Sequence, residues 1–130
     1  MIEEAIYSLL TGDAGIAAVV STRVYPVTLP QNAVLPAIAF TRISTSRALT
    51  HDGSTQIAES SFQISCFHTN VKSAKTLAGL VRAKLHGYKG TVGSDVIQVT
   101  EVVDEGPDIW EPDLEEYQIP LEVVFSHKES

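Results

Sequence analysis

The sequence predicts an α+β domain, in which helices pack on one side of a mainly antiparallel sheet. Apolar and polar residues alternate in Phe62–Cys66 and again in Tyr117–Ser126, the period of half-buried strands. Between these two segments, residues 71–85 carry apolar side chains at helical spacing. The resulting order of helix, strands, helix and strands favours a mixed but mainly antiparallel sheet. A length of 130 residues and a hydrophobic content of 44% predict one domain over residues 1–130.

The central helix has clear sequence signals at both ends. Asn70 can cap its first turn, and Gly87 supplies the residue that turns out of its last. One apolar stripe follows the helix: Val71, Ala74, Leu77, Ala78, Val81 and Leu85. Packing against the sheet therefore accounts for every apolar residue of this segment.

The N-terminal third predicts two short helices followed by two strands. An amphipathic helix covers Ile2–Leu10, and Asp13 can cap a further turn or two. Arg23–Val27 reads as a short strand, Thr28–Pro36 as a loop, and Ala37–Ser44 as a strand. The short N-terminal helix is expected to pack on the same face of the sheet as the central helix.

Two polar segments and two strands are expected in the rest of the chain. Ser46–Gln56 is either a long hairpin or a mobile loop, and Glu105–Glu115 is a second exposed loop. Both are predicted to be the most mobile parts of the free subunit until they contact a neighbour or the tube. Val96–Val103 is apolar on both faces, which predicts an interior strand. Pro120 lacks a ladder donor, so the last strand is predicted to be an edge strand or to be bulged at this residue.

Composition excludes several classes of function. The net charge of −7 argues against general affinity for nucleic acid, because that affinity comes mostly from neutralising phosphates, and we expect no specific nucleic-acid binding. The lone Cys66 rules out an internal disulfide. No apolar run is long enough for a membrane helix, and Glu3 and Glu4 argue against a signal peptide. We therefore expect a soluble protein of a reducing cytoplasm, without membrane contact.

Charge is strongly segregated along the chain. Five of the nine basic residues lie between Lys72 and Lys89, and nine carboxylates lie between Glu101 and Glu122. The acidic segment is either a solvated loop, one half of a contact with a neighbour's basic helix, or the lining of a pore. Trp110 either packs back on the core or anchors a partner. The candidate interface residues on these segments are Lys72, Lys75, Arg82, Lys84, Asp108, Trp110, Glu111 and Asp113.

Little in the sequence points to catalysis. His51 and Asp52 are adjacent in a polar segment, where they favour a turn over a catalytic pair and join the candidate interface. The other histidines are too dispersed for a metal site, and Cys66 reads as a small buried hydrophobe. We expect no catalytic residue, no cofactor and no metal.

Short segments along nearly the whole chain resemble a known family. They are Ile2–Thr11, Arg23–Pro26, Leu29–Gln31, Leu35–Ile38, His51–Gly53, Phe62–Ile64, Ala74–Leu85, Gly87–Gly90 and Trp110–Pro112. Together they resemble the small tail-completion proteins of long-tailed bacteriophages and of related prophage or gene-transfer particles. That group is similar in size and layout to the lambda-type tail terminator.

The resemblance implies a structural virion protein and not an enzyme. It implies a six-fold ring that caps the tail tube, ends tube polymerisation and presents a surface to the head connector. The implied partners are other copies of the chain, the tube protein and the connector or stopper protein, with DNA passing through the ring. The implied location is the head-proximal end of a tail assembled in the host bacterial cytoplasm. The alternatives are a head-closure or other connector component and, in another class, a small soluble enzyme or ligand-binding domain.

Overall fold

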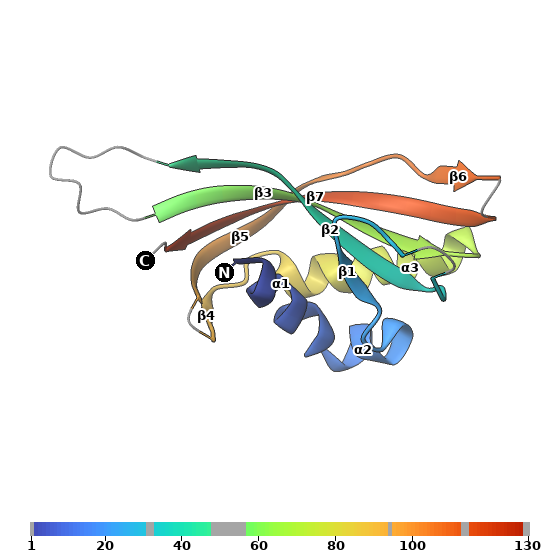
Figure 1. Cartoon of the computed structure of the whole chain (residues 1–130), viewed down its shortest axis with the longest axis horizontal. Coiled ribbons are helices and arrows are strands. Elements are labelled where there is room, and N and C mark those ends of the chain that lie inside the picture. Colours follow the sequence, from blue (N-terminus) through green and yellow to red (C-terminus); the bar gives the residue numbers. More distant parts are fainter. Residues whose placement is uncertain (1, 31–32, 48–56, 94, 113–114, 129–130) are drawn as a thin grey trace, which may run out of the picture.

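A computed structural model describes residues 2–30, 33–47, 57–93, 95–112 and 115–128 of the chain. Figure 1 shows these elements along the sequence. The helices are α1 (Ile2–Thr11), α2 (Ala14–Val20) and α3 (Val71–Leu85). The strands are β1 (Val24–Pro26), β2 (Ala37–Arg47), β3 (Ile57–His68), β4 (Gly90–Val92), β5 (Asp95–Glu105), β6 (Ile109–Glu111) and β7 (Glu116–Lys128).

The strands form one sheet in the order β1-β2-β3-β7-β5-β4, with β6 paired to β7. β1 runs parallel to β2, and the other pairs are antiparallel. The sheet is therefore mixed but mainly antiparallel, as the sequence predicts. Two of its three long central partners, β3 and β7, are the segments with the clearest alternation of apolar and polar residues, whereas β2 is buried throughout Ala37–Phe40.

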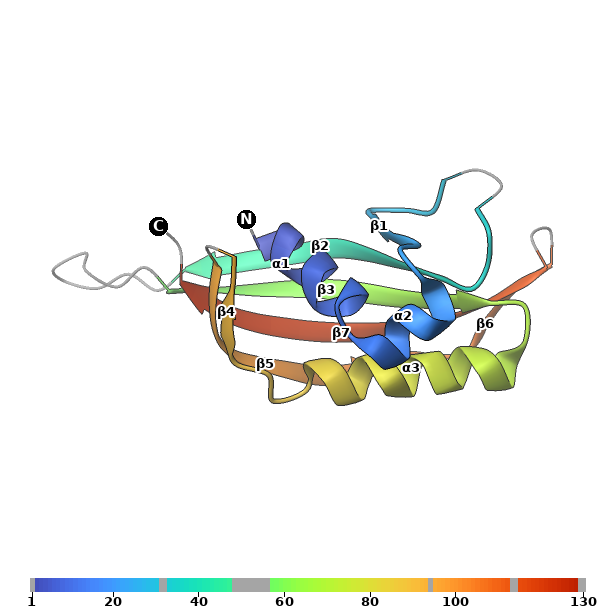
Figure 2. The ribbon, with the colours of Figure 1, turned by 90° about the horizontal axis from the view of Figure 1, so that it is seen from below.

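All three helices lie on one face of the sheet, and the other face has no helix over it (Figures 1 and 2). The core lies between the two layers. Phe62 of β3 and Phe125 of β7 meet edge to face at its centre, with ring centroids 5.8 Å apart. Five of the six residues predicted for the apolar stripe of α3 are buried against this layer, and Val71 in the first turn is half-buried; the five are Ala74, Leu77, Ala78, Val81 and Leu85. The α+β class and the placement of α1 and α3 on one face are thus confirmed.

Both predicted helix caps are present. The Asn70 side chain accepts a hydrogen bond from the Ser73 amide at 3.1 Å, and Asp13 accepts one from the Ile16 amide at 3.0 Å. Each bond satisfies an amide that the first turn leaves without an intrahelical partner. After α3, Gly87 has a φ of +79°, which a residue without a Cβ adopts at least cost.

The predicted place of the last strand is wrong. β7 is the central strand of the sheet, with β3 on one side and β5 and β6 on the other, and its register with β3 is unbroken through Pro120. The Pro120 carbonyl accepts a hydrogen bond from the Gly106 amide at 2.7 Å. The missing N–H of Pro120 points to the same side, because both groups of a strand residue face the same neighbour. That side is the gap between β5 and β6, so a central strand accommodates the proline.

The predicted interior position of Val96–Val103 is also largely wrong. Of β5, only Ile97 and Thr100 are buried, and β4 covers β5 only at Asp95–Ile97. Two register shifts in β5 disturb the alternation, and no helix covers the second face. Apolar residues on both faces therefore do not identify a doubly covered strand here.

The two predicted polar segments are partly strand. Ser46 and Arg47 belong to β2, and residues 48–56 lie outside the described part of the chain. Within Glu105–Glu115, Ile109–Glu111 forms β6 against β7. The helices that the structure describes are all too short or too polar to cross a membrane.

Candidate functional site

The residues with possible chemistry are dispersed in the described structure. His68 lies on β3, His86 directly after α3, and His127 on β7. Each makes a hydrogen bond: His68 with the Thr69 amide, His86 with the Val102 amide and His127 with the Ser60 hydroxyl. Cys66 is fully buried, and burial first and Glu105 second raise the pKa of its thiol to about 12. Such a thiol stays protonated and behaves as the predicted small hydrophobe. The described residues contain no group of three side chains placed to hold a metal ion.

Three predicted candidates cannot be placed. His51, Asp52 and Asp113 lie outside the described residues. The other candidates lie on two elements, the helix α3 and the segment around β6.

The basic helix and the acidic segment meet within one chain. The Lys75 ammonium lies 2.9 Å from an Asp108 carboxylate oxygen, and the Arg82 guanidinium lies 3.9 Å from Glu105. All four side chains are about half exposed, so each pair stabilises the fold by roughly 1 kcal/mol or less. The two segments are therefore complementary in charge, and part of that complementarity is used inside the subunit, an arrangement that is not among the predictions from the sequence.

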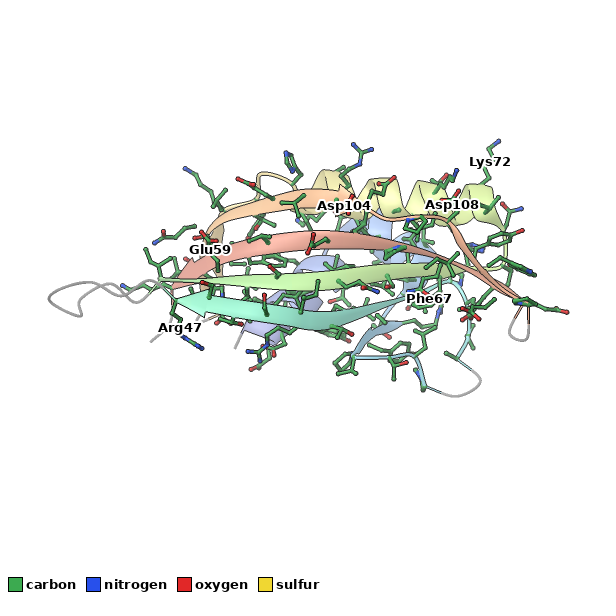
Figure 3. All side chains as sticks on the ribbon, turned by 90° about the horizontal axis from the view of Figure 1, so that it is seen from above. Arg47, Glu59, Phe67, Lys72, Asp104 and Asp108 are labelled. Carbon is green, nitrogen blue, oxygen red and sulfur yellow. The ribbon has the colours of Figure 1, made fainter. Side chains whose placement is uncertain are left out.

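The remaining helix cations are directed elsewhere. The Lys84 ammonium lies 5.7 Å from the centre of the Tyr88 ring, and Lys72 is exposed in the first turn of α3 (Figure 3). These two cations have no ion pair with Asp108 or Glu105 and so leave positive charge on the outer flank of the helix.

Trp110 takes a position between the two predicted alternatives. Its ring packs on Tyr117 of the neighbouring strand, with centroids 4.5 Å apart, yet 45% of the residue remains exposed. The indole is thus held in one place by β7 and still offers a large apolar surface to solvent. Such a ring is a suitable anchor for a partner.

The uncovered face of the sheet is acidic. Figure 3 shows this face, on which Glu59 and Asp104 are labelled. Strand register places Asp104 opposite Glu122, and Glu111 opposite Glu116. Glu101 lies on the same face, opposite Val124. Among the described strand positions of this face, Lys128 is the one basic residue. The acidic character of one whole face emerges only when β3, β5, β6 and β7 come together.

One end of this face is hollowed. A shallow open hollow of about 280 Å³ has Gln63, Ser65 and Gln118 in its floor. The Ser65 hydroxyl accepts hydrogen bonds from both amide side chains, at 3.1 and 2.9 Å. At the rim, desolvation first and the Glu111 carboxylate second raise the pKa of Glu116. The polar groups of the floor thus bond mainly to one another, which suits a contact surface better than a reaction site.

Comparison with known proteins decides the family. The family model for "Tail completion protein gp17" matches residues 4–107, most of the chain. The chain belongs to the tail completion protein gp17 family. This family consists of structural proteins of phage-type tails, and the resemblance found in the sequence is confirmed. A search of the curated proteins gave no match.

The fold is also similar to a chain of a solved particle. That structure is described as "Virion of native gene transfer agent (GTA) particle", and it superposes with a TM-score of 0.74 at 20% sequence identity. The alignment covers 98% of this chain and 95% of the other. The two chains therefore share the complete fold, with few elements added to either.

Proposed function

We propose that this protein caps the head-proximal end of a tail tube as a closed ring of six copies. The ring ends tube polymerisation at the set length and then presents a surface to the head connector or stopper protein. The partners in this proposal are other copies of the chain, the tube protein and the connector. Assembly takes place in the cytoplasm of the bacterial host, and the finished ring is part of the virion tail.

The family match over residues 4–107 is the observation that carries this proposal. The likeness to a chain of a gene transfer agent virion supports it, because the alignment covers 98% of this chain and 95% of the other. The two described hollows are both open and shallow.

The acidic face of the sheet is consistent with a ring through which DNA passes. Carboxylates on four strands repel phosphates, so a lumen lined by this face would not retain the genome. In this arrangement, the helical layer faces outward. The arrangement also agrees with the predicted absence of specific nucleic-acid binding.

Deletion of the gene in the producing cell, followed by electron microscopy of the particles, tests the proposal. If the protein is a tail terminator, its loss should give tubes of abnormal and variable length that do not join heads. Expression of the chain in trans should restore tails of uniform length.

The alternative of a head-closure component gives a different result. Its loss should leave tails of normal length that remain separate from heads. A deletion that leaves complete, joined particles would contradict both roles and return the protein to the class of small enzymes or ligand-binding domains.

A further inference from the structure

Exposed large aliphatic residues lie on the two opposite edges of the sheet. Beside β2, Val27 and Ile43 are 69% and 52% exposed. Along β5, Val96, Val99 and Val103 are 37%, 42% and 49% exposed. The middle strands β3 and β7 carry no exposed large hydrophobic residue among their described positions. The apolar surface is thus concentrated at the edges, where an isolated subunit gains nothing from it.

Each edge is only partly covered within the subunit. β1 pairs with β2 only at Ile38–Phe40, so β2 continues from Thr41 to Arg47 without a described outer neighbour. On the other side, β4 pairs with β5 only at Asp95–Ile97. We refer to the first surface, with Val27 and Ile43, as the β2 edge. The second, with Val96, Val99 and Val103, is the β5 edge. Figure 2 shows β1 and β5 at opposite sides of the molecule.

We propose that neighbouring copies of this protein join side to side, with the β2 edge of one copy packed on the β5 edge of the next. This inference rests on the proposed ring and identifies the surfaces that would close it. Because the two edges differ and lie at opposite ends of the strand order, their contact is head to tail. A head-to-tail contact leaves one edge free at each end and therefore closes into a ring when its rotation fits.

Charge favours a second copy as the occupant of each edge. The β2 edge carries Arg42 and Arg47, and Arg42 keeps 47% of its side chain exposed while it pairs with Glu3. β5 carries three exposed carboxylates: Glu101 and Asp104 on its uncovered-face side, and Glu105, which lies 3.9 Å from Arg82 and stays about half exposed. Opposite charges around an apolar centre set the register of a contact and disfavour like edges against one another.

The mode of contact is packing of side chains and not the addition of a strand. The end of α3 already occupies backbone groups on the outer side of β5. The Gly87 amide donates to the Thr100 carbonyl at 2.7 Å, and the Val102 amide donates to His86 Nδ1 at 3.2 Å. A register shift leaves the exposed Ile43 of β2 without a strand partner, and a similar shift leaves the exposed Val103 of β5 without one. Such bulges interrupt a ladder and hold a side chain outward.

A groove next to the β5 edge can receive an aliphatic side chain. It measures about 430 Å³ and is lined by Arg82, Ala83, His86 and Val102. Register places Val102 opposite the buried Val123, so the groove lies on the helix side of β5, next to the bulged Val103. The groove includes the flank of α3 that the charge pattern of the sequence singles out.

Crosslinking with a short bismaleimide tests the contact. The native Cys66 is fully buried, so introduced thiols are the accessible ones. We expect the double variant I43C/V103C, as concentrated protein and in purified particles, to give a ladder of covalent oligomers that ends at the ring size. We expect I43C alone and V103C alone to give no link, and their mixture to give dimers only.

The alternatives give separate results. A link formed by I43C alone would indicate a two-fold contact of like edges and would overturn the proposal. Copies that assemble by light scattering but give no link between the two positions would overturn it too, while the proposed ring would stand. A chain that stays monomeric and is absent from purified particles would refute the ring itself and this contact with it.

Blocking each edge in turn gives an independent test. I43R disables the β2 edge and V103R disables the β5 edge, so we expect each variant alone to lose at least nine-tenths of its assembled form. Mixed in equal amounts, they should form one-to-one dimers and nothing larger, because one intact edge of each kind remains. The control A18R places the same charge at an exposed position of α2, in the helical layer, and should assemble as the native chain. Normal assembly of I43R or V103R would contradict the proposal.

Discussion

Two buried or half-buried polar residues show how local chemistry departs from the simple pattern of the sequence. Thr100 lies on the buried side of β5, and its hydroxyl has no hydrogen-bond partner among the described residues. Glu116 lies directly opposite Glu111 on the uncovered face, where burial and repulsion both disfavour its charged form. Both residues lower the stability of the folded chain, and the effect of each can be measured with a single substitution.

We expect Thr100→Val to raise the free energy of unfolding by about 1 kcal/mol, because it replaces an unpaired buried hydroxyl with a methyl group of similar size. Urea denaturation of the native chain and the variant measures the change. Thr45→Val is the matched control, since the Thr45 hydroxyl lies 3.1 Å from that of Ser60, and this variant should be destabilised. A loss of stability in Thr100→Val equal to that of the control would mean that Thr100 has a partner.

Glu116 predicts a dependence of stability on pH. Its pKa is raised above the usual 4.5 in the folded chain, so the folded state holds the proton more tightly than the unfolded state. Stability from this group is complete below that usual pKa and is lost as pH rises through the raised pKa. We expect Glu116→Gln to raise Tm at pH 7 and this gain to shrink toward pH 4. Glu101→Gln, whose strand partner is Val124, is the control. Gains that do not vary with pH in Glu116→Gln would refute the assignment.

At the scale of elements, the central helix unites the fold. α3 packs against β3, β5 and β7 and also contacts α1 and α2, so it holds the helical layer to the sheet. Its cap at Asn70, its apolar stripe and its end at Gly87 are all written in consecutive residues. The same helix contributes Arg82 and His86 to the groove beside β5. The element that stabilises the subunit therefore also shapes its surface.

We expect Leu77→Ala to lower the free energy of unfolding by about 2–5 kcal/mol, because it removes methyl groups from a fully buried position and leaves a cavity. Leu80→Ala lies one turn further on the same helix at a partly buried position and should cost clearly less. Thermal and urea denaturation of both variants measure the difference. Equal losses would mean that helix propensity or another common factor, and not burial, sets the cost.

At the scale of the whole molecule, the fold separates its surfaces by character. The helices cover one face, carboxylates dominate the other, and exposed aliphatic residues lie at the two edges. A subunit with different and opposite edges is suited to a closed ring. The half-exposed ion pairs of α3 lie beside one of those edges. Charge interactions between half-exposed side chains weaken as the salt concentration rises.

We expect the double variant K75E/R82E to weaken assembly, and we expect native assembly to weaken as salt concentration rises, because exposed charges are screened beyond about 8 Å at physiological ionic strength. Sedimentation at several salt concentrations measures both effects. Denaturation of the dilute subunit is the control. It should change by about 1 kcal/mol or less for each half-exposed pair lost. Assembly that is indifferent to salt and to the double reversal would show that the contact is wholly apolar.

The sequence by itself determined the elements whose signals are local: the caps at Asp13 and Asn70, the stripe of α3 and the alternation in β3 and β7. It also determined the family, since its segments are distributed along nearly the whole chain. Only the tertiary structure decided the order of the strands. Pro120 suggested an edge, but it sits in the central strand, because a gap between β5 and β6 faces its missing N–H. The candidate surfaces depend on the same order. Local patterns fix helices and strands, whereas the neighbours of a strand depend on contacts between residues far apart in the chain.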